Sequence, residues 1–259
     1  MTPILKQAIA GGLFALTAGT VTPLAADTML EQGAEHRFQL DFHVPDAALQ
    51  KMLPNGWVPQ VAAMGPAKDA NIRMIFIDRI NVVSSDGKPA GRGTSHMVYL
   101  AVPVKQSAGE MTGQIIIAGL TDNAADAPGP FGVYQFSPNA KMTRSVTSYG
   151  GQTIGTEDWD FATPSGERMQ VHVKYEHAAA NKGGGDVKFF NPSDPAKYQI
   201  FRTEQGTDIT RNATTNPPDR VKEFSYKAGG GRIAALFDGT EKVLSWDSQP
   251  FYSRTVIQP

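Results

Sequence analysis

Short runs of alternating apolar and polar residues, broken by turn signals, recur along this chain and constrain its fold more than any other feature. Residues 94–104 and 114–120 are rich in β-branched and aromatic side chains and flank a turn at Gly109. Such side chains favour strands, and a glycine between two strand-like runs is typical of a turn. The stretch therefore predicts two adjacent strands, followed by a loop through Pro128-Gly129-Pro130 that re-enters at Tyr134.

The same pattern continues on both sides of this stretch. Residues 35–44 place Phe38, Leu40 and Phe42 on one face and polar side chains on the other, as in a half-buried strand. Residues 71–83 are largely apolar on both faces and predict a central strand that is covered on both sides. Residues 47–53 predict a short helix. Shorter strands are expected at residues 142–149, 167–176, 187–190, 198–203 and 223–227.

Three other segments carry weaker or different signals. Residues 152–161 are polar and weakly patterned, and residues 177–197, with three consecutive glycines, predict a long loop around the strand at 187–190. Asp238-Gly239 predicts a hairpin between residues 232–237 and 242–246. No change in composition marks a domain boundary, so residues 27–259 are expected to form a single, mainly β domain with a few short helices.

The first 26 residues differ from the rest and predict a signal peptide. Lys6 precedes an apolar, small-residue segment at 8–21, and small residues at 24–26 suit cleavage before Asp27. The apolar segment is too short and too rich in glycine for a comfortable membrane span. A periplasmic or secreted bacterial protein is therefore expected, with no membrane attachment after removal of this segment; an N-terminal membrane anchor is the alternative.

Charge and composition argue against several classes of function. The net charge is −1, only 19% of residues are charged, and the basic residues are scattered, so no nucleic-acid partner is expected. The chain has no cysteine, which excludes thiol nucleophiles and disulfides. His172, Glu176 and His177 could bind zinc, but same-face strand residues lie about 7 Å apart, which favours a solvated face. No metal and no cofactor are expected.

The order of these segments resembles the acetoacetate decarboxylase-like family. The resemblance rests on the strand, short helix and Leu-Pro element at 38–54, the strand at 72–77, the run Ala101-Val102-Pro103-Val104, and the acidic turn at Asp122-Asn123. It implies a closed, cone-like antiparallel β barrel around a ligand cavity, in a homo-oligomer. It also implies that the ligand is a small organic acid, keto acid or ketone.

The chain departs from that family at the positions that carry its chemistry. In the family a lysine of a Pro-Lys-Lys run forms a Schiff base with a ketone, and acetoacetate decarboxylase is itself the standard example of an amine activated by desolvation and a neighbouring cation. Residues 129–138 contain no lysine here, and the nearest is Lys141. Two glutamates of the family cavity are replaced by Ile75 and Met97. The cavity is therefore expected to be mostly apolar.

Strand alternation extends the expected lining beyond these two positions. The lining that follows is Arg73, Ile75, Ile77, Ser95, Met97 and Tyr99 from the strands, with Tyr134 and Phe136 from the loop. Arg73 is the main charged group of this set and suits a ligand carboxylate or enolate. The alternative is that Ile75, Met97 and Phe136 fill a collapsed core, as side chains do in many small barrels.

Two functions remain open on this evidence. The first is a carbon–carbon lyase, resembling a decarboxylase, with Lys141 as the amine and Arg73 holding the substrate carboxylate. The second is a non-catalytic periplasmic small-molecule-binding protein that holds its ligand without covalent chemistry. The absence of the family lysine favours loss of the Schiff-base chemistry.

Overall fold

Strands make up most of the structure, a computed structural model that describes residues 27–211 and 219–259. They are β1 (Thr28–His43), β2 (Trp57–Pro59), β3 (Ile72–Ser84), β4 (Ser95–Gln106), β5 (Thr112–Thr121), β6 (Tyr134–Phe136), β7 (Lys141–Tyr149), β8 (Gln152–Ala162), β9 (Arg168–Glu176), β10 (Asn181–Asn191), β11 (Asp194–Arg211), β12 (Val221–Gly229) and β13 (Lys242–Gln258). The helical elements are α1 (Asp46–Gln50) and the 3₁₀ turns η1 (Ala124–Asp126) and η2 (Gly231–Ile233). None of the described helices is long and apolar enough to cross a membrane. The predicted signal peptide, residues 1–26, lies outside the described residues.

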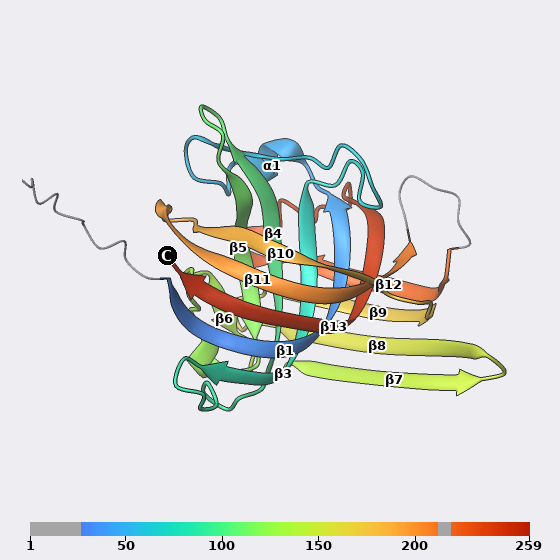
Figure 1. Ribbon diagram of the computed structural model, residues 1–259. Helices are drawn as coiled ribbons and strands as arrows, with labels where there is room; N and C mark the ends of the chain where they lie inside the picture. Colours follow the sequence, from blue (N-terminus) through green and yellow to red (C-terminus); the bar gives the residue numbers. More distant parts are fainter. Residues whose placement is uncertain (1–26, 212–218) are drawn as a thin grey trace, which may run out of the picture.

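Seven strands close into a barrel in the order β4-β3-β1-β13-β11-β10-β5, with β5 returning to β4. The long strands β1, β13 and β11 curve side by side around one side of it (Figure 1). Neighbouring barrel strands run antiparallel except β10 and β5, which are parallel and pair only Phe189 with Gln114 and Phe190 with Ile115. The expected fold class, a mainly β chain built around a closed barrel, is confirmed.

A second sheet, in the order β12-β9-β8-β7, packs against the outside of the barrel (Figure 1). Phe76 of β3 contacts both Trp159 and Phe161 of β8, with ring centroids 5.7 and 6.4 Å apart. This packing buries outward side chains of β1, β3 and β13, such as Phe38, Phe76 and Trp246, while the inward side chains of the strands are buried inside the barrel. The prediction that residues 71–83 are covered on both faces holds for residues 72–79, whereas Ile80 and Asn81 are exposed.

The strand expected at residues 35–44 forms within β1, but the prediction that its polar face is exposed is wrong. Arg37, Gln39 and Asp41 are at most 8% exposed because they point into the closed barrel. A strand with one apolar and one polar face normally has its polar face in water. Here both faces are buried, and the polar one forms part of the barrel interior.

Two weakly patterned segments are strands, contrary to prediction. Residues 152–161 form most of β8, in which every second residue from Gly155 to Phe161 is buried. One of these is Glu157, a charged residue at a buried position of the second sheet. A carboxylate at such a position interrupts the apolar–polar alternation by which a strand is recognised in the sequence. Its oxygens accept hydrogen bonds from Tyr175 (2.8 Å) and Trp159 (3.0 Å), which makes its burial tolerable. The loop expected at 177–197 is largely the antiparallel pair β10 and β11.

The hairpin expected around Asp238-Gly239 is also absent from the described residues. Ile233 and Leu236 are both fully buried, and the backbone N–H of Leu236 donates to the carbonyl of Ile233. A spacing of three between buried residues suits consecutive tight turns and not a strand. The segment before Asp238 therefore forms turns whose apolar side chains pack into the core. Only the segment after it, β13, is extended.

Candidate functional site

The inside of the barrel holds a cluster of apolar and aromatic side chains, called here the inner cluster. Its members are Ile75, Ile77, Met97, Tyr99, Ala101, Ile116, Phe131, Tyr134, Phe189, Phe201 and Val256. Because alternate side chains of a strand face opposite ways, the strand residues of this cluster are inward-facing ones, and Phe131 joins them from the loop before β6. The inner cluster fills the middle of the barrel and leaves space towards its two ends.

Two hollows remain, one towards each end of the barrel. The loop hollow, about 420 Å³, lies beside residues 125–130 and is lined by Glu31, Arg79, Met97, Tyr134, Gln199 and Arg254, among others. The polar hollow, about 340 Å³, is lined by Arg37, Gln39, Arg73, Ile75, Tyr99, Gln114, Asp247 and Gln249, among others. Along β1, β3, β11 and β13 the two linings occupy different ends of the strand, which places the hollows at opposite ends of the barrel.

A buried ion-pair network separates the two hollows. Glu35 accepts a hydrogen bond from Arg37 Nε at 2.6 Å and lies 2.9 Å from Arg254 Nη2. Arg37 also stacks over the ring of Tyr252 at 3.5 Å and donates to the Tyr99 hydroxyl at 3.4 Å. Burial alone would raise the pKa of Glu35, but the nearby guanidinium groups hold that pKa below its ordinary value. The carboxylate is therefore ionised and fixes both arginines.

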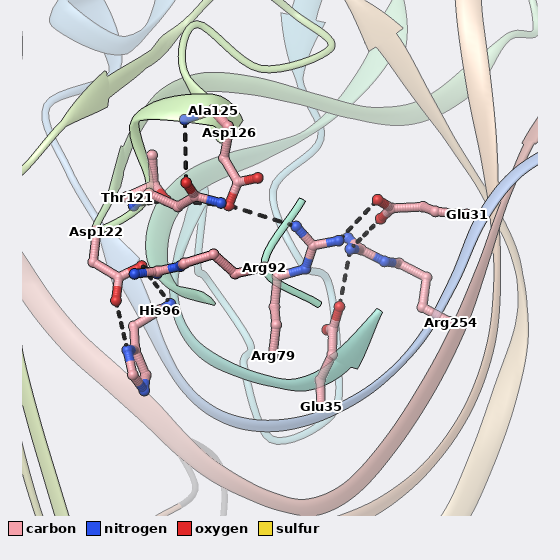
Figure 2. A network of polar contacts seen from close by, with 11 residues as sticks. Glu31, Glu35, Arg79, Arg92, His96, Thr121, Asp122, Ala125, Asp126 and Arg254 are labelled. Atoms are coloured by element: carbon pink, nitrogen blue, oxygen red, sulfur yellow. Dashed lines mark hydrogen bonds and ion pairs between the residues drawn. The ribbon is translucent and has the colours of Figure 1, made fainter. Parts of the chain in front are cut away.

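The charged groups of the loop hollow pair with one another (Figure 2). Arg79 donates to one oxygen of Glu31 and Arg254 to the other, each at 2.8 Å. Arg79 Nη1 also lies 3.8 Å from Asp126 Oδ2, at the end of the barrel. With its cations and anions already matched, this end offers few charges for a ligand.

Tyr134 closes the loop hollow against the inner cluster because two glycines make room for its ring. A Cβ added to Gly119 would lie 1.9 Å from the ring, and one added to Gly129 would lie 2.0 Å from it. Gly129 also has a φ of +74°, a conformation that favours glycine. Tyr134 stacks on Tyr99 with centroids 6.5 Å apart, and burial raises the pKa of its hydroxyl. The phenol is therefore a neutral, fixed part of the wall.

The polar hollow has a different kind of lining, with an arginine that is only partly paired. Arg73 Nε lies 3.4 Å from Asp41 Oδ1, and the side chain is 34% exposed. Asp41 is also held by Gln39 Nε2 at 3.2 Å and by the Ser245 hydroxyl at 2.7 Å. Among the described residues, neither terminal nitrogen of Arg73 has a hydrogen-bond partner. Those two nitrogens are free to bind an anion.

Three further polar groups lining the polar hollow have no partner among the described residues. The buried atoms are Asp247 Oδ1, Gln249 Oε1 and Gln114 Oε1. Burial, and then the neighbouring carboxylate of Asp41, raise the pKa of Asp247 to about 7, against the opposing effect of Arg73. Buried polar atoms in folded proteins nearly always have partners. Unpartnered atoms from β13 and β5 that line one hollow indicate a place for a ligand.

The residues expected in one cavity are thus distributed over several places. Ile75 and Tyr99 belong to the inner cluster and line the polar hollow with Arg73, whereas Met97 and Tyr134 line the loop hollow. Ser95 is buried but lines neither hollow. Phe136 is 41% exposed at the end of the three-residue β6, so the expectation that it faces inward is not met.

Lys141 lies outside the barrel. It begins β7 in the second sheet, is exposed, and lines a surface hollow with Asp158 and His172. No lysine lines either of the two barrel hollows in the described part of the chain. The catalytic function assigned to Lys141 stays a prediction.

The buried arginines Arg37 and Arg254, and Asp247, were not predicted as site residues from the sequence. Arg37 belongs to the face of β1 that was expected to be solvated. Arg254 and Asp247 lie in β13, of which only residues 242–246 were expected. A register shift at residues 250–251, opposite His36, moves the inward positions from odd numbers, such as Asp247, to even numbers, such as Arg254. A search for alternation in two registers joined at Pro250 would have found this strand.

Comparison with known proteins supports the fold. No protein-family model and no curated protein matches the chain. Among solved structures, the enduracididine biosynthesis enzyme MppR complexed with pyruvate matches with a TM-score of 0.53 at 13% identity, over 93% of this chain and 91% of that one. MppR with HEPES buffer bound matches with a TM-score of 0.54 at 14% identity, over 98% and 97%. An acetoacetate decarboxylase-like enzyme from Sphingomonas wittichii RW1 matches with a TM-score of 0.51 at 13% identity, over 96% and 98%.

These structural neighbours are acetoacetate decarboxylase-like enzymes, and the chain has their fold. The family that the order of segments resembles is therefore the one to which the architecture is similar. At these identities the likeness concerns the fold, and the function has to be argued from the residues of the barrel.

Proposed function

We propose that this protein binds a small organic acid in the polar hollow, with Arg73 holding the carboxylate. The observation that carries the proposal is the half-exposed guanidinium, whose two terminal nitrogens have no partner among the described residues. Arginine matches a carboxylate with two parallel N–H···O bonds. The loop hollow is the weaker candidate because Arg79 and Arg254 are already paired there.

The fold of the chain supports a ligand of this class. One structural neighbour, MppR, has a solved structure in complex with pyruvate, a small keto acid. The volume of the polar hollow, about 340 Å³, lies at the lower end of the range typical of small-molecule sites. Ile75 and Tyr99 supply an apolar wall beside Arg73. A molecule with a few carbon atoms and one carboxylate suits this combination.

The proposal favours binding without a Schiff base. An amine nucleophile must reach the carbonyl carbon, and a desolvated site must lower its pKa. Lys141 is exposed on the second sheet and satisfies neither condition in this structure. A lyase that uses Lys141 is the alternative, and it requires a covalent intermediate that can be trapped.

Calorimetric titration with pyruvate and acetoacetate tests the binding proposal. We expect Arg73→Gln to weaken binding at least tenfold, because a charged hydrogen bond contributes about 1.5–3 kcal/mol. Arg168→Gln, a change at an exposed arginine of β9, is the matched control and should leave the dissociation constant unchanged. Equal affinity in wild type and Arg73→Gln would exclude the proposed carboxylate site.

Borohydride reduction in the presence of acetoacetate or pyruvate tests the covalent alternative. We expect no mass increase on any lysine by intact mass spectrometry. An adduct that maps to Lys141 and disappears in Lys141→Ala would instead establish the amine chemistry and a lyase.

We also propose, from residues 1–26 and from the family resemblance, that the mature chain is exported and forms a homo-oligomer. Fractionation of the native host would test the location, and light scattering of the chain from residue 27 onward would test the assembly. Retention of the full-length chain in the membrane fraction would favour the uncleaved anchor instead.

A further inference from the structure

We infer that the ligand of the polar hollow carries an ammonium group as well as a carboxylate, so that its chemical class is the amino acids. The inference rests on the proposed function, in which Arg73 holds the carboxylate. It adds a second recognition element, formed by Asp247 together with Gln249 and Gln114. These three residues each have a buried oxygen without a hydrogen-bond partner among the described residues.

The two recognition elements lie on strands that flank β1. Arg73 of β3 is opposite Asp41, and Asp247 of β13 is opposite Gln39. Two inter-strand spacings separate β3 from β13, roughly 10 Å between backbones, and both side chains line the polar hollow. Gln114 approaches from β5, which does not neighbour β1 or β13 in the barrel. A short molecule with opposite charges at its two ends fits between them.

Among these unpartnered atoms, the carboxylate of Asp247 decides the chemistry of the ligand. The amide of Gln249 or Gln114 can present either its oxygen or its nitrogen to a ligand. A carboxylate oxygen accepts hydrogen bonds and, when ionised, cannot donate one. The best complement to a buried acceptor that lacks a cation is a positively charged donor, and an ammonium group provides three N–H bonds.

The balance of charges around the polar hollow also favours an amino acid as the ligand. Arg37 is paired with Glu35, and Asp186 with Arg202. What remains is one guanidinium, Arg73, against the carboxylates of Asp41 and Asp247.

A simple carboxylate ligand would bring a third anion to that single cation, which is unfavourable where water is excluded. An amino acid brings its own compensating charge. A keto acid would instead direct a carbonyl oxygen at Asp247, so that two acceptors would face each other.

The test compares amino acids with the keto acids that differ from them at one carbon. Alanine and pyruvate form one pair, and glutamate and 2-oxoglutarate form the other. Both pairs are titrated calorimetrically at pH 8 into wild type, Asp247→Asn and Arg73→Gln. Asn is close to Asp in shape and removes the charge, and melting temperatures of the three proteins establish that each is folded.

We expect at least one amino acid to bind wild type ten times more tightly than its keto acid. In Asp247→Asn this preference should fall at least fivefold, whereas Arg73→Gln should weaken both members of a pair by a similar factor. Equal or tighter binding of the keto acids, in an Arg73-dependent manner, would overturn the inference and leave the proposed carboxylate site standing. Absence of Arg73-dependent binding by any of the four probes would overturn both.

A second measurement uses pH and needs no variant. The groups whose charges act on Asp247 are Asp41 on β1, Arg73 on β3 and Asp208 on β11. Both amino acids keep a charged ammonium group between pH 6 and pH 8, while Asp247 gains a proton on going to pH 6 because its pKa is about 7. The preference for the amino acid should therefore decrease at pH 6. A preference that is the same at both pH values would contradict the assignment of Asp247 as the ammonium partner.

Discussion

The two ends of the barrel are built from the same strands, but they differ in how completely their charged side chains are paired. At the loop hollow, Arg79 and Arg254 converge on the two oxygens of Glu31 (Figure 2). At the polar hollow, Asp247 has a buried oxygen without a partner among the described residues, and Arg73 has only a long contact with Asp41. In the loop hollow the charged side chains pair with one another, although the buried atoms Arg79 Nε and Gln199 Oε1 also lack hydrogen-bond partners among the described residues. In the polar hollow the group with the unpartnered oxygen is a carboxylate that has no cation of its own.

This difference shows that burial and charge alone do not identify a binding site. Glu35, Arg37 and Arg254 are all buried, pair with one another as ions and form a partition. Groups that a ligand can use are those whose hydrogen bonds are incomplete in its absence. The following changes should affect the two ends differently.

The largest effect is expected from Glu35→Gln, which removes the anion between Arg37 and Arg254. The two guanidinium groups would then remain buried without their shared partner, which costs about 3–5 kcal/mol in the free energy of unfolding. Urea denaturation of wild type and variant measures the difference. Glu110→Gln, at an exposed position, is the control and should change little. A loss of less than about 1 kcal/mol would mean that the partition is not held together by this carboxylate.

The next largest effect is expected from Gly119→Ala, which places a methyl group 1.9 Å from the ring of Tyr134. Either the ring or the strand must shift, and overpacking of this kind costs about 2–3 kcal/mol. In Gly183→Ala the new Cβ would meet Gln205 at 3.7 Å, an ordinary contact, so this control should be nearly neutral. Thermal unfolding compares the two. Similar melting temperatures would show that Tyr134 is not confined by Gly119.

Asp247→Asn should stabilise the protein without ligand, by about 2 kcal/mol at pH 8. The folded-state pKa of Asp247 is about 7, above the value near 3.9 in an unfolded chain. Between these values the folded protein binds more protons, so the contribution of Asp247 to stability falls as pH rises from about 4 to 7. Urea denaturation from pH 4 to 8 should show this fall in wild type and a flatter profile in the variant. Asp160→Asn serves as a control, and a variant profile as steep as that of wild type would argue against the raised pKa.

The smallest effect on stability is expected from Arg73→Gln, because the side chain is partly exposed and makes one long ion pair. A change of less than about 1 kcal/mol is anticipated for such a pair. Arg79→Gln, at the opposite end, removes a 2.8 Å hydrogen bond to Glu31 and should cost about 2 kcal/mol. If Arg73→Gln were the more destabilising change, Arg73 would be a structural residue and the contrast between the two ends would disappear.

Much of the fold can be predicted from the alternation of side chains along strands, but only where all residues on one face of a strand have the same polarity. The strand at residues 71–83 was predicted because both of its faces are apolar, and β3 is covered on both faces over residues 72–79. The closed barrel was then predicted because the order of the segments resembles that of the acetoacetate decarboxylase-like family. Alternation failed in β8, where Glu157 occupies a buried position, and in β13, where a register shift at Pro250 interrupts the period.

The candidate site was less accessible to sequence reasoning for a physical reason. Arg73, Ile75 and Tyr99 were predicted to lie together, and the structure brings them to one hollow. Asp247 reaches the same hollow from a strand far away in sequence, and its significance depends on which partners it lacks. The absence of a partner is a property of the assembled barrel, and a local pattern cannot reveal it.

The parallel contact between β10 and β5 has a consequence for how the barrel wall fluctuates. The wall is continuous there through only two residue pairs, whereas β1 and β3 form a long ladder. Separating β10 from β5 breaks few backbone hydrogen bonds, and local opening follows the regions where such bonds are fewest. Gln114 and Phe189, which line the polar hollow, are paired across this junction. Amide hydrogens near it should therefore exchange with solvent sooner than those of β1 and β3, and a bound ligand that contacts Gln114 should slow them.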